Sequence, residues 1–271
     1  MRDSYLVKNG FAVPMFRSPD HPITRSSDFP AGSRPPTRDN LYTSFMKKII
    51  IAIDGPAGSG KSTLASLLAK KYNYVNIETG AMYRALGLKA IETGMSLDDE
   101  AALLELARTS LIQLIPNPEG NRVLLDGADV THRIREQDVT DAASRVSVHP
   151  KVREWMVHSQ RAMGTGGGVV MEGRDIGTKV FPNAEVKIFL DAHPEVRGNR
   201  RVQQSPAEAA REKEVHAELQ KRDERDRGRA ASPLEPAPDA VMIDSTHLSL
   251  DQVVEKAIEL VEGKLRERVT N

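Results

Sequence analysis

The stretch IAIDGPAGSGKSTLA, residues 51–65, has the pattern of a buried strand, a glycine loop and a helix that begins at once. The motif G-x-x-x-x-G-K-[ST] runs without departure from Gly55 to Ser62. Its glycines let backbone N–H groups turn onto phosphate oxygens, and the helix N-terminus adds the positive end of its dipole. From average residue usage, a chance match in a chain of this length has odds of about one in a hundred. The sequence therefore predicts a nucleotide-binding loop.

Within this loop each residue type has an expected task. Lys61 should reach the β- and γ-phosphates of ATP, and the Ser62 hydroxyl should ligate Mg²⁺. We expect the nucleotide to contact the whole loop: Gly55, Pro56, Ala57, Gly58, Ser59, Gly60, Lys61, Ser62 and Thr63.

The composition is that of an ordinary globular protein with no charge bias. Of 271 residues, 39% are hydrophobic, and 38 Lys and Arg balance 38 Asp and Glu. No global basic excess points to nucleic acid, and no apolar run approaches the roughly 18 residues of a membrane helix. Cysteine is absent, which excludes disulfides and cysteine-based zinc sites. We expect a cytoplasmic monomer whose partners are small molecules, with no nucleic acid and no membrane among them.

The first forty-five residues differ from the rest. They hold six of the sixteen prolines and show no sustained periodicity, so we predict that residues 1–45 are disordered and that residues 46–271 form the folded domain. Two origins of this segment are considered. One is a targeting segment, but the four acidic residues Asp3, Asp20, Asp28 and Asp39 and the lack of an apolar signal core argue against it. The other is an upstream extension, with Met46 as the true start.

From Lys47 onward, strand patterns alternate with helix patterns. Expected strands lie near residues 49–53, 74–78, 169–172, 186–192 and 240–244, and expected helices near 60–71, 80–94, 96–109, 136–164, 194–229 and 249–269. Ser96 is the expected cap of the third helix, and Gly94 should stop the second. This alternation predicts an α/β fold with a mostly parallel sheet flanked by helices, whose ligand lies at the carboxyl ends of the strands. Turn signals at residues 117–121 and at Asp126-Gly127 predict a small antiparallel insert.

Sequence motifs that the chain lacks narrow the class of phosphate-loop protein to which it could belong. The chain has no N-K-x-D guanine motif and no LSGGQ sequence, and the strand pattern VVMEGRD does not end in Asp-Glu. GTPases, ABC-type ATPases and motor-type ATPases are therefore disfavoured. A small-molecule kinase remains.

Three further motifs could hold the acceptor. In ETGAMYR, residues 78–84, Thr79 could cap a helix and Arg84 could clamp a phosphate, although a surface Arg beside a core Tyr83 is as common. In EGRDIGT, residues 172–178, Asp175 could accept a hydrogen bond from an exocyclic amine, or form only a salt bridge in a loop. RDERDRGR, residues 222–229, could be a solvated face, a nucleic-acid patch or the arginines of a mobile lid.

Taken together, these motifs resemble those of the bacterial-type cytidylate kinases. IDGPAGSGKST, ETGAMYR, EGRDIGTKVFPNAEVKIFLDA, KRDERDRGR and IDSTHLSLDQVVEKA keep the family's order from about Lys47 to the end. The resemblance implies a core, a nucleoside-monophosphate-binding insert at about residues 79–165 and a helical lid at about 205–230. Residues 1–45 have no counterpart in the family pattern.

The resemblance also implies a role for each acceptor residue. Ser144, Arg153 and Asp175 would read cytosine; Arg84, Arg174 and Arg229 would hold phosphate; Arg222 and Asp226 would face the ribose and close the lid; Thr79 and Tyr83 would complete the site. The catalytic set would be Lys61, Arg174, Arg222 and Arg229, with Arg197 and Arg201 beside ATP. Glu172 stands where Asp is common, one methylene longer, which puts its reach to a Mg²⁺-bound water in doubt.

The implied reaction is phosphoryl transfer from ATP to CMP or dCMP without a general base, dependent on Mg²⁺. A kinase for another acceptor, such as UMP or shikimate, is one rival, but a carboxylate at Asp175 favours the amine of cytosine. A nucleotide-dependent regulator or RNA-binding protein that uses the arginine-rich stretch is the other.

Overall fold

The computed structural model describes residues 5–8, 11–14, 48–117, 120–203 and 211–270. Its centre is a five-stranded, fully parallel sheet in the order β10-β9-β3-β8-β4. The strands are β3 (Ile50–Asp54), β4 (Val75–Glu78), β8 (Val169–Gly173), β9 (Val186–Asp191) and β10 (Val241–Asp244). The predicted α/β class with a parallel sheet is confirmed.

The middle strand, β3, is buried on both faces, because helices cover each side of the sheet. Ile51 and Ile53 point to one face and pack with helices α2 (Lys61–Tyr72) and α10 (Leu250–Thr270). Ala52 points to the other face, where helices α3 (Thr79–Glu92) and α6 (Pro150–Gly164) contribute to the larger core. This alternation follows from the two-residue period of a strand.

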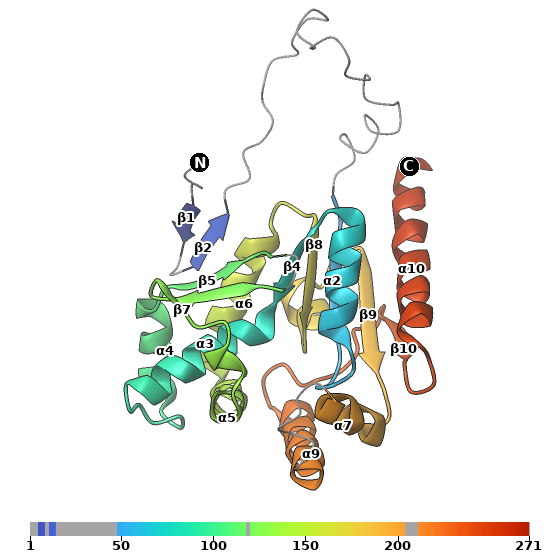
Figure 1. Ribbon diagram of the computed structural model, residues 1–271. Helices are drawn as coiled ribbons and strands as arrows, with labels where there is room; N and C mark the ends of the chain where they lie inside the picture. Colours follow the sequence, from blue (N-terminus) through green and yellow to red (C-terminus); the bar gives the residue numbers. More distant parts are fainter. Residues whose placement is uncertain (1–4, 9–10, 15–47, 118–119, 204–210, 271) are drawn as a thin grey trace, which may run out of the picture.

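A small antiparallel sheet lies beside α3 and α4 (Glu100–Thr109), as predicted from turns (Figure 1). Its strands are β5 (Ile112–Ile115), β6 (Arg122–Leu125) and β7 (Ala128–Asp129). Asp126 (φ 51°) and Gly127 (φ 87°) form the left-handed two-residue turn between β6 and β7, which confirms the predicted hairpin. A 3₁₀ turn (Arg133–Arg135) and helix α5 (Gln137–Val146) follow.

Two short strands differ from the predicted disorder of residues 1–45. β1 (Tyr5–Lys8) and β2 (Phe11–Pro14) pair with each other, and Phe11 continues the small sheet beside Ile112 of β5. Both have strand-forming sequences, YLVK and FAVP, and β5 would otherwise present an unpaired edge. The rest of residues 1–45, and Met46 after them, lie outside the described residues.

The helix starts at α3 and α4 differ from prediction. Asp99 Oδ1 accepts the N–H of Ala102 at 3.0 Å and caps α4, whereas the Ser96 hydroxyl accepts the N–H of Asp98 in the turn before it. Thr79 is the first residue of α3 rather than its cap, and its hydroxyl donates to the carbonyl of Glu172 at 2.8 Å. α3 ends just before Gly94 (φ 64°), as expected.

Two helices lie beyond the carboxyl ends of the core strands: α7 (Pro194–Gln203) and α9 (Glu212–Gly228) (Figure 1). They contact each other, and α9 carries most of the arginine-rich motif. The predicted lid includes α9, while residues 204–210 are outside the described part. Over the described ranges, no helix has the length and apolar character needed to span a bilayer.

Candidate active site

The phosphate loop connects β3 to α2 through glycines with positive φ angles. Gly55 (φ 148°) and Gly58 (φ 74°) approach other backbone closely: a Cβ added to them would lie 2.0 Å from the carbonyl oxygen of Leu190 and 2.8 Å from that of Arg197. Gly60 (φ 98°) is the left-handed residue before α2. Glycine is therefore required by both conformation and space, and the helix N-terminus opens toward the sheet edge.

Lys61 lies folded against its own loop. It is 5% exposed, and its Nζ donates to the carbonyl of Pro56 at 2.5 Å and to Ser59 Oγ at 3.3 Å. Burial, and then the nearby Arg174, lower the pKa of Lys61 to about 7. The protonated form of Lys61 is therefore disfavoured here, and an anion bound beside it would stabilise that form.

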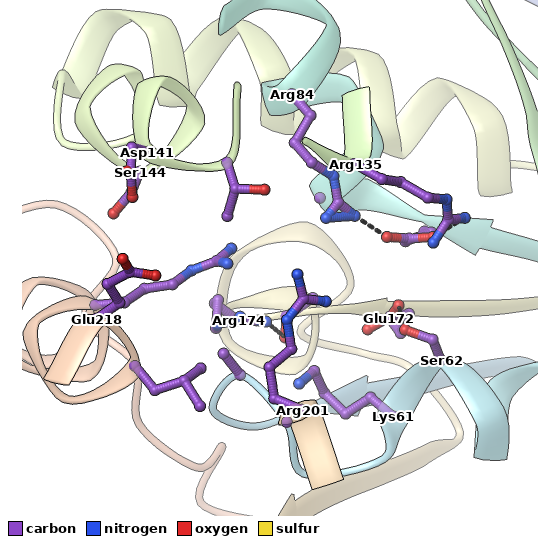
Figure 2. A pocket seen from close by; sticks show the side chains of 18 of the residues that line it. Lys61, Ser62, Arg84, Arg135, Asp141, Ser144, Glu172, Arg174, Arg201 and Glu218 are labelled. Atoms are coloured by element: carbon purple, nitrogen blue, oxygen red, sulfur yellow. Dashed lines mark hydrogen bonds and ion pairs between the residues drawn. The ribbon is translucent and has the colours of Figure 1, made fainter. Parts of the chain in front are cut away.

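Ser62 and Glu172 meet across the sheet edge. Ser62 Oγ donates to Glu172 Oε1 at 2.5 Å, so the Glu172 side chain reaches the first turn of α2 (Figure 2). Burial raises the pKa of Glu172, and the carboxylate of Glu78 raises it further. A hydroxyl and a carboxylate at one point are oxygen donors of the kind that Mg²⁺ prefers, so these residues fit the ion.

Beside the loop, a cleft of about 590 Å³ adjoins a smaller pocket of about 50 Å³. The two share Arg174 and Arg222 in their walls. The smaller pocket is lined by every acceptor residue predicted from the sequence except Arg84, which lines the larger cleft: Thr79, Tyr83, Ser144, Arg153, Arg174, Asp175, Arg222, Asp226 and Arg229. The fold therefore brings together residues that lie up to 150 positions apart.

Arg153 and Asp175 form a buried pair at the end of this pocket. Arg153 Nη2 lies 2.6 Å from Asp175 Oδ2, and the guanidinium covers the ring of Tyr83 at 5.5 Å. Ser144, by contrast, is engaged by the lid, because its Oγ accepts a hydrogen bond from Arg225 at 2.8 Å. Asp175 thus lines the pocket as a carboxylate that is already paired with one arginine.

A second buried cluster joins the lid to the end of β8. Asp226 Oδ2 accepts a hydrogen bond from Arg174 Nε at 2.9 Å, and Asp226 Oδ1 lies 3.5 Å from Arg229 Nη1. Burial alone would raise the pKa of Asp226, but Arg174, Arg222 and Arg229 lower it overall. Burial and the neighbouring Arg174 lower the pKa of Arg222 to about 10. This surplus of guanidinium groups favours an anionic ligand.

Several buried polar atoms of the site have no hydrogen-bond partner among the described residues: Tyr83 Oη, Arg84 Nε, Arg153 Nε, Arg229 Nε and Arg229 Nη2. Buried donors in native proteins are nearly always satisfied, and leaving one unpaired costs about 1–3 kcal/mol. A ligand with phosphate and carbonyl oxygens would satisfy them.

On the opposite wall of the larger cleft, Arg84 is held by an acid. Arg84 Nη2 forms an ion pair with Glu78 Oε1, and Arg135 lies 3.8 Å from the other oxygen, Oε2. Figure 2 shows Arg84 on one side of the cleft, facing Lys61 and Arg201 on the other. A phosphate between them would meet cations from both walls.

The structure gives the two predicted ATP arginines different positions. Arg201 lines the large cleft, as expected. Arg197 does not line it: its side chain is buried, donates to the Ala57 carbonyl at 3.0 Å and pairs with Asp223 at 2.6 Å. The prediction that Arg197 lies beside ATP therefore disagrees with its placement, because the packing of α7 under the loop uses this side chain as a support.

Other polar residues of the cleft were not predicted: Arg135, Gln137, Thr140, Asp141, Glu218 and Arg225. They come from the insert helices and the lid rather than from the ends of core strands. No glycine motif or strand end marks them in the sequence. These residues line the cleft because the folded chain places the helices α5 and α9 beside it.

Comparison with known proteins identifies a family. A family model described as cytidylate kinase matches residues 51–263. The chain is 51% identical over 224 residues to a cytidylate kinase of Geobacillus kaustophilus, covering 81% of this chain and 99% of the relative. It is 45% identical over 218 residues to one of Vibrio cholerae, with 80% and 97% covered. Among solved structures, a gluconokinase from Sinorhizobium meliloti matches at a TM-score of 0.45 and 15% identity, over 83% of this chain and 98% of that chain. That last likeness is too low to bear on function.

Proposed function

The chain belongs to the cytidylate kinase family, and we propose that the cleft described above transfers the γ-phosphate of ATP to the phosphate of CMP or dCMP. The main support for this proposal is the small pocket beside the phosphate loop. Its buried carboxylate, Asp175, is surrounded by guanidinium groups with unsatisfied donors. An anionic nucleotide whose base offers an amine matches both features.

The transfer needs no general base in this proposal. The second pKa of a phosphate monoester is about 6, so the acceptor oxygen is already anionic at neutral pH. What the protein must supply is alignment of the two phosphates, neutralisation of their charge and exclusion of water. The arginines on both walls of the cleft are placed for the second task.

Each cation has a proposed partner. Lys61 would leave Pro56 and Ser59 for the β- and γ-phosphates, and Arg201 would face the triphosphate from α7. Arg174, Arg222 and Arg229 would surround the phosphate being transferred or accepted, with Arg84 on the other side. Because their guanidinium forks can each meet two oxygens, they fix geometry as well as charge.

Ser62 and Glu172 are the residues that would hold Mg²⁺, directly or through water. When bound, the ion neutralises phosphate charge during transfer. Ser62 Oγ would exchange its present hydrogen bond to Glu172 for this role. Glu172 would then carry its full negative charge beside the metal.

Cytosine recognition falls to Asp175 and Arg153. One carboxylate oxygen of Asp175 is taken by Arg153, so the other, Oδ1, would accept the exocyclic amine. Uracil has a carbonyl oxygen at that position. Two acceptor oxygens would then face each other with no donor to form a hydrogen bond, which disfavours uracil. Asp226 and Arg222 would face the ribose, and Tyr83 and Thr79 would complete the walls.

We further propose the division of the domain into a core, an insert at about residues 79–165 and a lid at about 205–230, with a cytoplasmic monomer as the working form. These proposals rest on the family pattern. The contacts of α9 with Ser144 and Arg174 support a lid that closes over the acceptor.

The test is ADP release coupled to a dye assay, with Mg-ATP and CMP, dCMP, UMP, AMP or shikimate as acceptor. Wild-type turnover with CMP and dCMP should far exceed that with UMP. Asp175→Asn should lose about tenfold or more in kcat/KM for CMP, because a buried hydrogen-bonded charge is removed. Asp126→Asn, at the exposed turn of the insert, is the control. Turnover with a different acceptor would overturn the base assignment, and salt-sensitive RNA binding without turnover would favour the regulator.

A further inference from the structure

We propose that Asp54, the last residue of β3, is a positioning residue that keeps the carboxylate of Asp175 available for the base. The inference rests on the proposed function, since it concerns how that site is held. Asp54 lies directly before Gly55 of the phosphate loop and is 4% exposed. It lines neither the large cleft nor the small pocket, so it would act through another residue.

The carboxylate of Asp54 binds the backbone of the acceptor motif. Its Oδ1 accepts the N–H of Ile176 at 2.8 Å, and its Oδ2 accepts the N–H of Gly177 at 2.7 Å. These two residues begin the π-helical turn Ile176–Val180, which follows Asp175. The N–H groups at the start of a helical turn have no partner within it, so the carboxylate from β3 satisfies them.

Asp175 itself stands at the N-cap position of this turn. An aspartate there ordinarily accepts one of the free N–H groups with its own side chain. In this structure it makes no such bond, and its carboxylate pairs with Arg153 at 2.6 Å instead. Because Asp54 occupies the N–H groups of the turn, the Asp175 side chain is left to face Arg153 and the pocket.

The buried surroundings of Asp54 make its two backbone contacts important, because the described residues bring few other groups to its carboxyl. Burial raises the pKa of Asp54 to about 7, and the neighbouring Asp175 raises it too, while the N–H groups of Gly177 and Ile176 and the cation of Lys61 lower it. The two N–H groups of the turn therefore offset part of the cost of burying this carboxyl group.

Gly177 makes the close approach possible. A Cβ added to Gly177 would lie 3.3 Å from Asp54 Oδ2, 3.3 Å from Lys187 Cδ and 3.4 Å from Ala237 Cβ. A side chain there would push the turn away from the carboxylate by a few tenths of an ångström. Gly177→Ala therefore perturbs the same contact from the other partner.

The first experiment compares Asp54→Asn with Thr178→Val in the acceptor assay. Thr178 lies in the same turn, and its hydroxyl has no hydrogen-bond partner among the described residues, so its removal leaves the Asp54 contacts intact. In Asp54→Asn the amide can accept from one N–H but opposes the other, and Asp175 is free to cap its own turn. We expect the KM for CMP to rise about tenfold and the preference for CMP over UMP to fall by a similar factor, with the KM for ATP within about twofold.

The second experiment measures amide hydrogen exchange of the segment around Ile176 and Gly177. Exchange should accelerate in Asp54→Asn and stay near wild type in Thr178→Val. If Asp54→Asn does not fold, Gly177→Ala takes its place, with a smaller loss of CMP preference expected.

An unchanged CMP preference in a folded Asp54→Asn would overturn the proposal, as would unchanged exchange. Loss of ATP affinity with the CMP preference intact would also overturn it, because Asp54 would then serve the phosphate loop instead. These outcomes differ from failure of the proposed function, which would show as no CMP-dependent turnover in the wild type.

Discussion

At the level of single residues, the protonation state of Lys61 should depend on whether a triphosphate is bound beside it. Its pKa is lowered to about 7 by burial and by the neighbouring Arg174, so near neutral pH the amine is only partly protonated. A bound triphosphate beside it would favour the charged form and raise that pKa toward its ordinary value. Nucleotide binding between about pH 7 and pH 10 should therefore take up a proton.

This linkage gives the first prediction. At pH 8, wild-type protein should absorb close to one more proton on binding Mg-ATP than Lys61→Met, and wild-type affinity should decline as pH rises from 7 to 10. Calorimetric titration in two buffers of different ionisation enthalpy measures the uptake. Equal uptake by wild type and Lys61→Met would contradict the assigned role.

The second prediction concerns Arg229, which is almost fully buried and has two nitrogens without a hydrogen-bond partner in the described part of the chain. A lysine keeps the charge but cannot reproduce the planar fork. Arg229→Lys should raise the KM for CMP about tenfold and leave the KM for ATP within about twofold. Arg227→Lys, exposed in the last turn of α9 just before Arg229, serves as the matched control, and similar kinetics for the two variants would argue against acceptor contact.

Residue types at strand ends made part of the candidate site predictable, and the family resemblance supplied the residues of the insert and the lid. Asp175 and Arg174 follow β8, and Arg84 follows β4, because parallel strands deliver their carboxyl ends to one edge. The contacts of Arg197 and of Asp54 were not predictable. Both depend on which backbone groups pack against the loop, and a motif read along the chain carries no such information.

At the scale of elements, the strands and the hairpin followed from pattern, whereas helix caps did not. Ser96 and Asp99 are both good capping residues three positions apart, so the sequence leaves the choice open. In the structure Asp99 provides the cap, and α4 packs against α3 and α6. Strand pairing of Phe11 with β5 was equally hidden, since it joins segments about a hundred residues apart.

The third prediction tests that cap. Asp99→Ala should lower the free energy of unfolding by about 1 kcal/mol, because the N–H of Ala102 loses its partner. Ser96→Ala, which removes only the turn contact, should cost less than about 0.5 kcal/mol. Urea unfolding followed by circular dichroism compares them. A larger loss for Ser96→Ala would return the cap to Ser96.

At the scale of the whole molecule, one buried arginine links three parts. Arg197 of α7 binds Ala57 in the phosphate loop, the Ala192 carbonyl after β9 and Asp223 in α9. We therefore expect movement of α9 to affect the loop that would hold ATP. The overall α/β architecture was predictable from alternating patterns, but this linkage arises only when α7 and α9 fold together.

The fourth prediction follows from this coupling. Asp223→Asn should loosen α9 and raise the share of γ-phosphate lost to water about threefold or more, because water is excluded less well. Asp251→Asn, in the first turn of α10, is the control. Free phosphate and nucleoside diphosphate are measured in the same reaction. An unchanged ratio would show that α9 does not depend on this contact.

The central claim is that the γ-phosphate passes to a cytidine nucleotide and not to water. The most direct measurement is ³¹P NMR of the protein with Mg-ATP and CMP, followed over time. The account predicts CDP and ADP appearing in equal amounts, with little inorganic phosphate and with ATP stable when CMP is left out. Inorganic phosphate as the main product, or ATP loss that is independent of CMP, would contradict it.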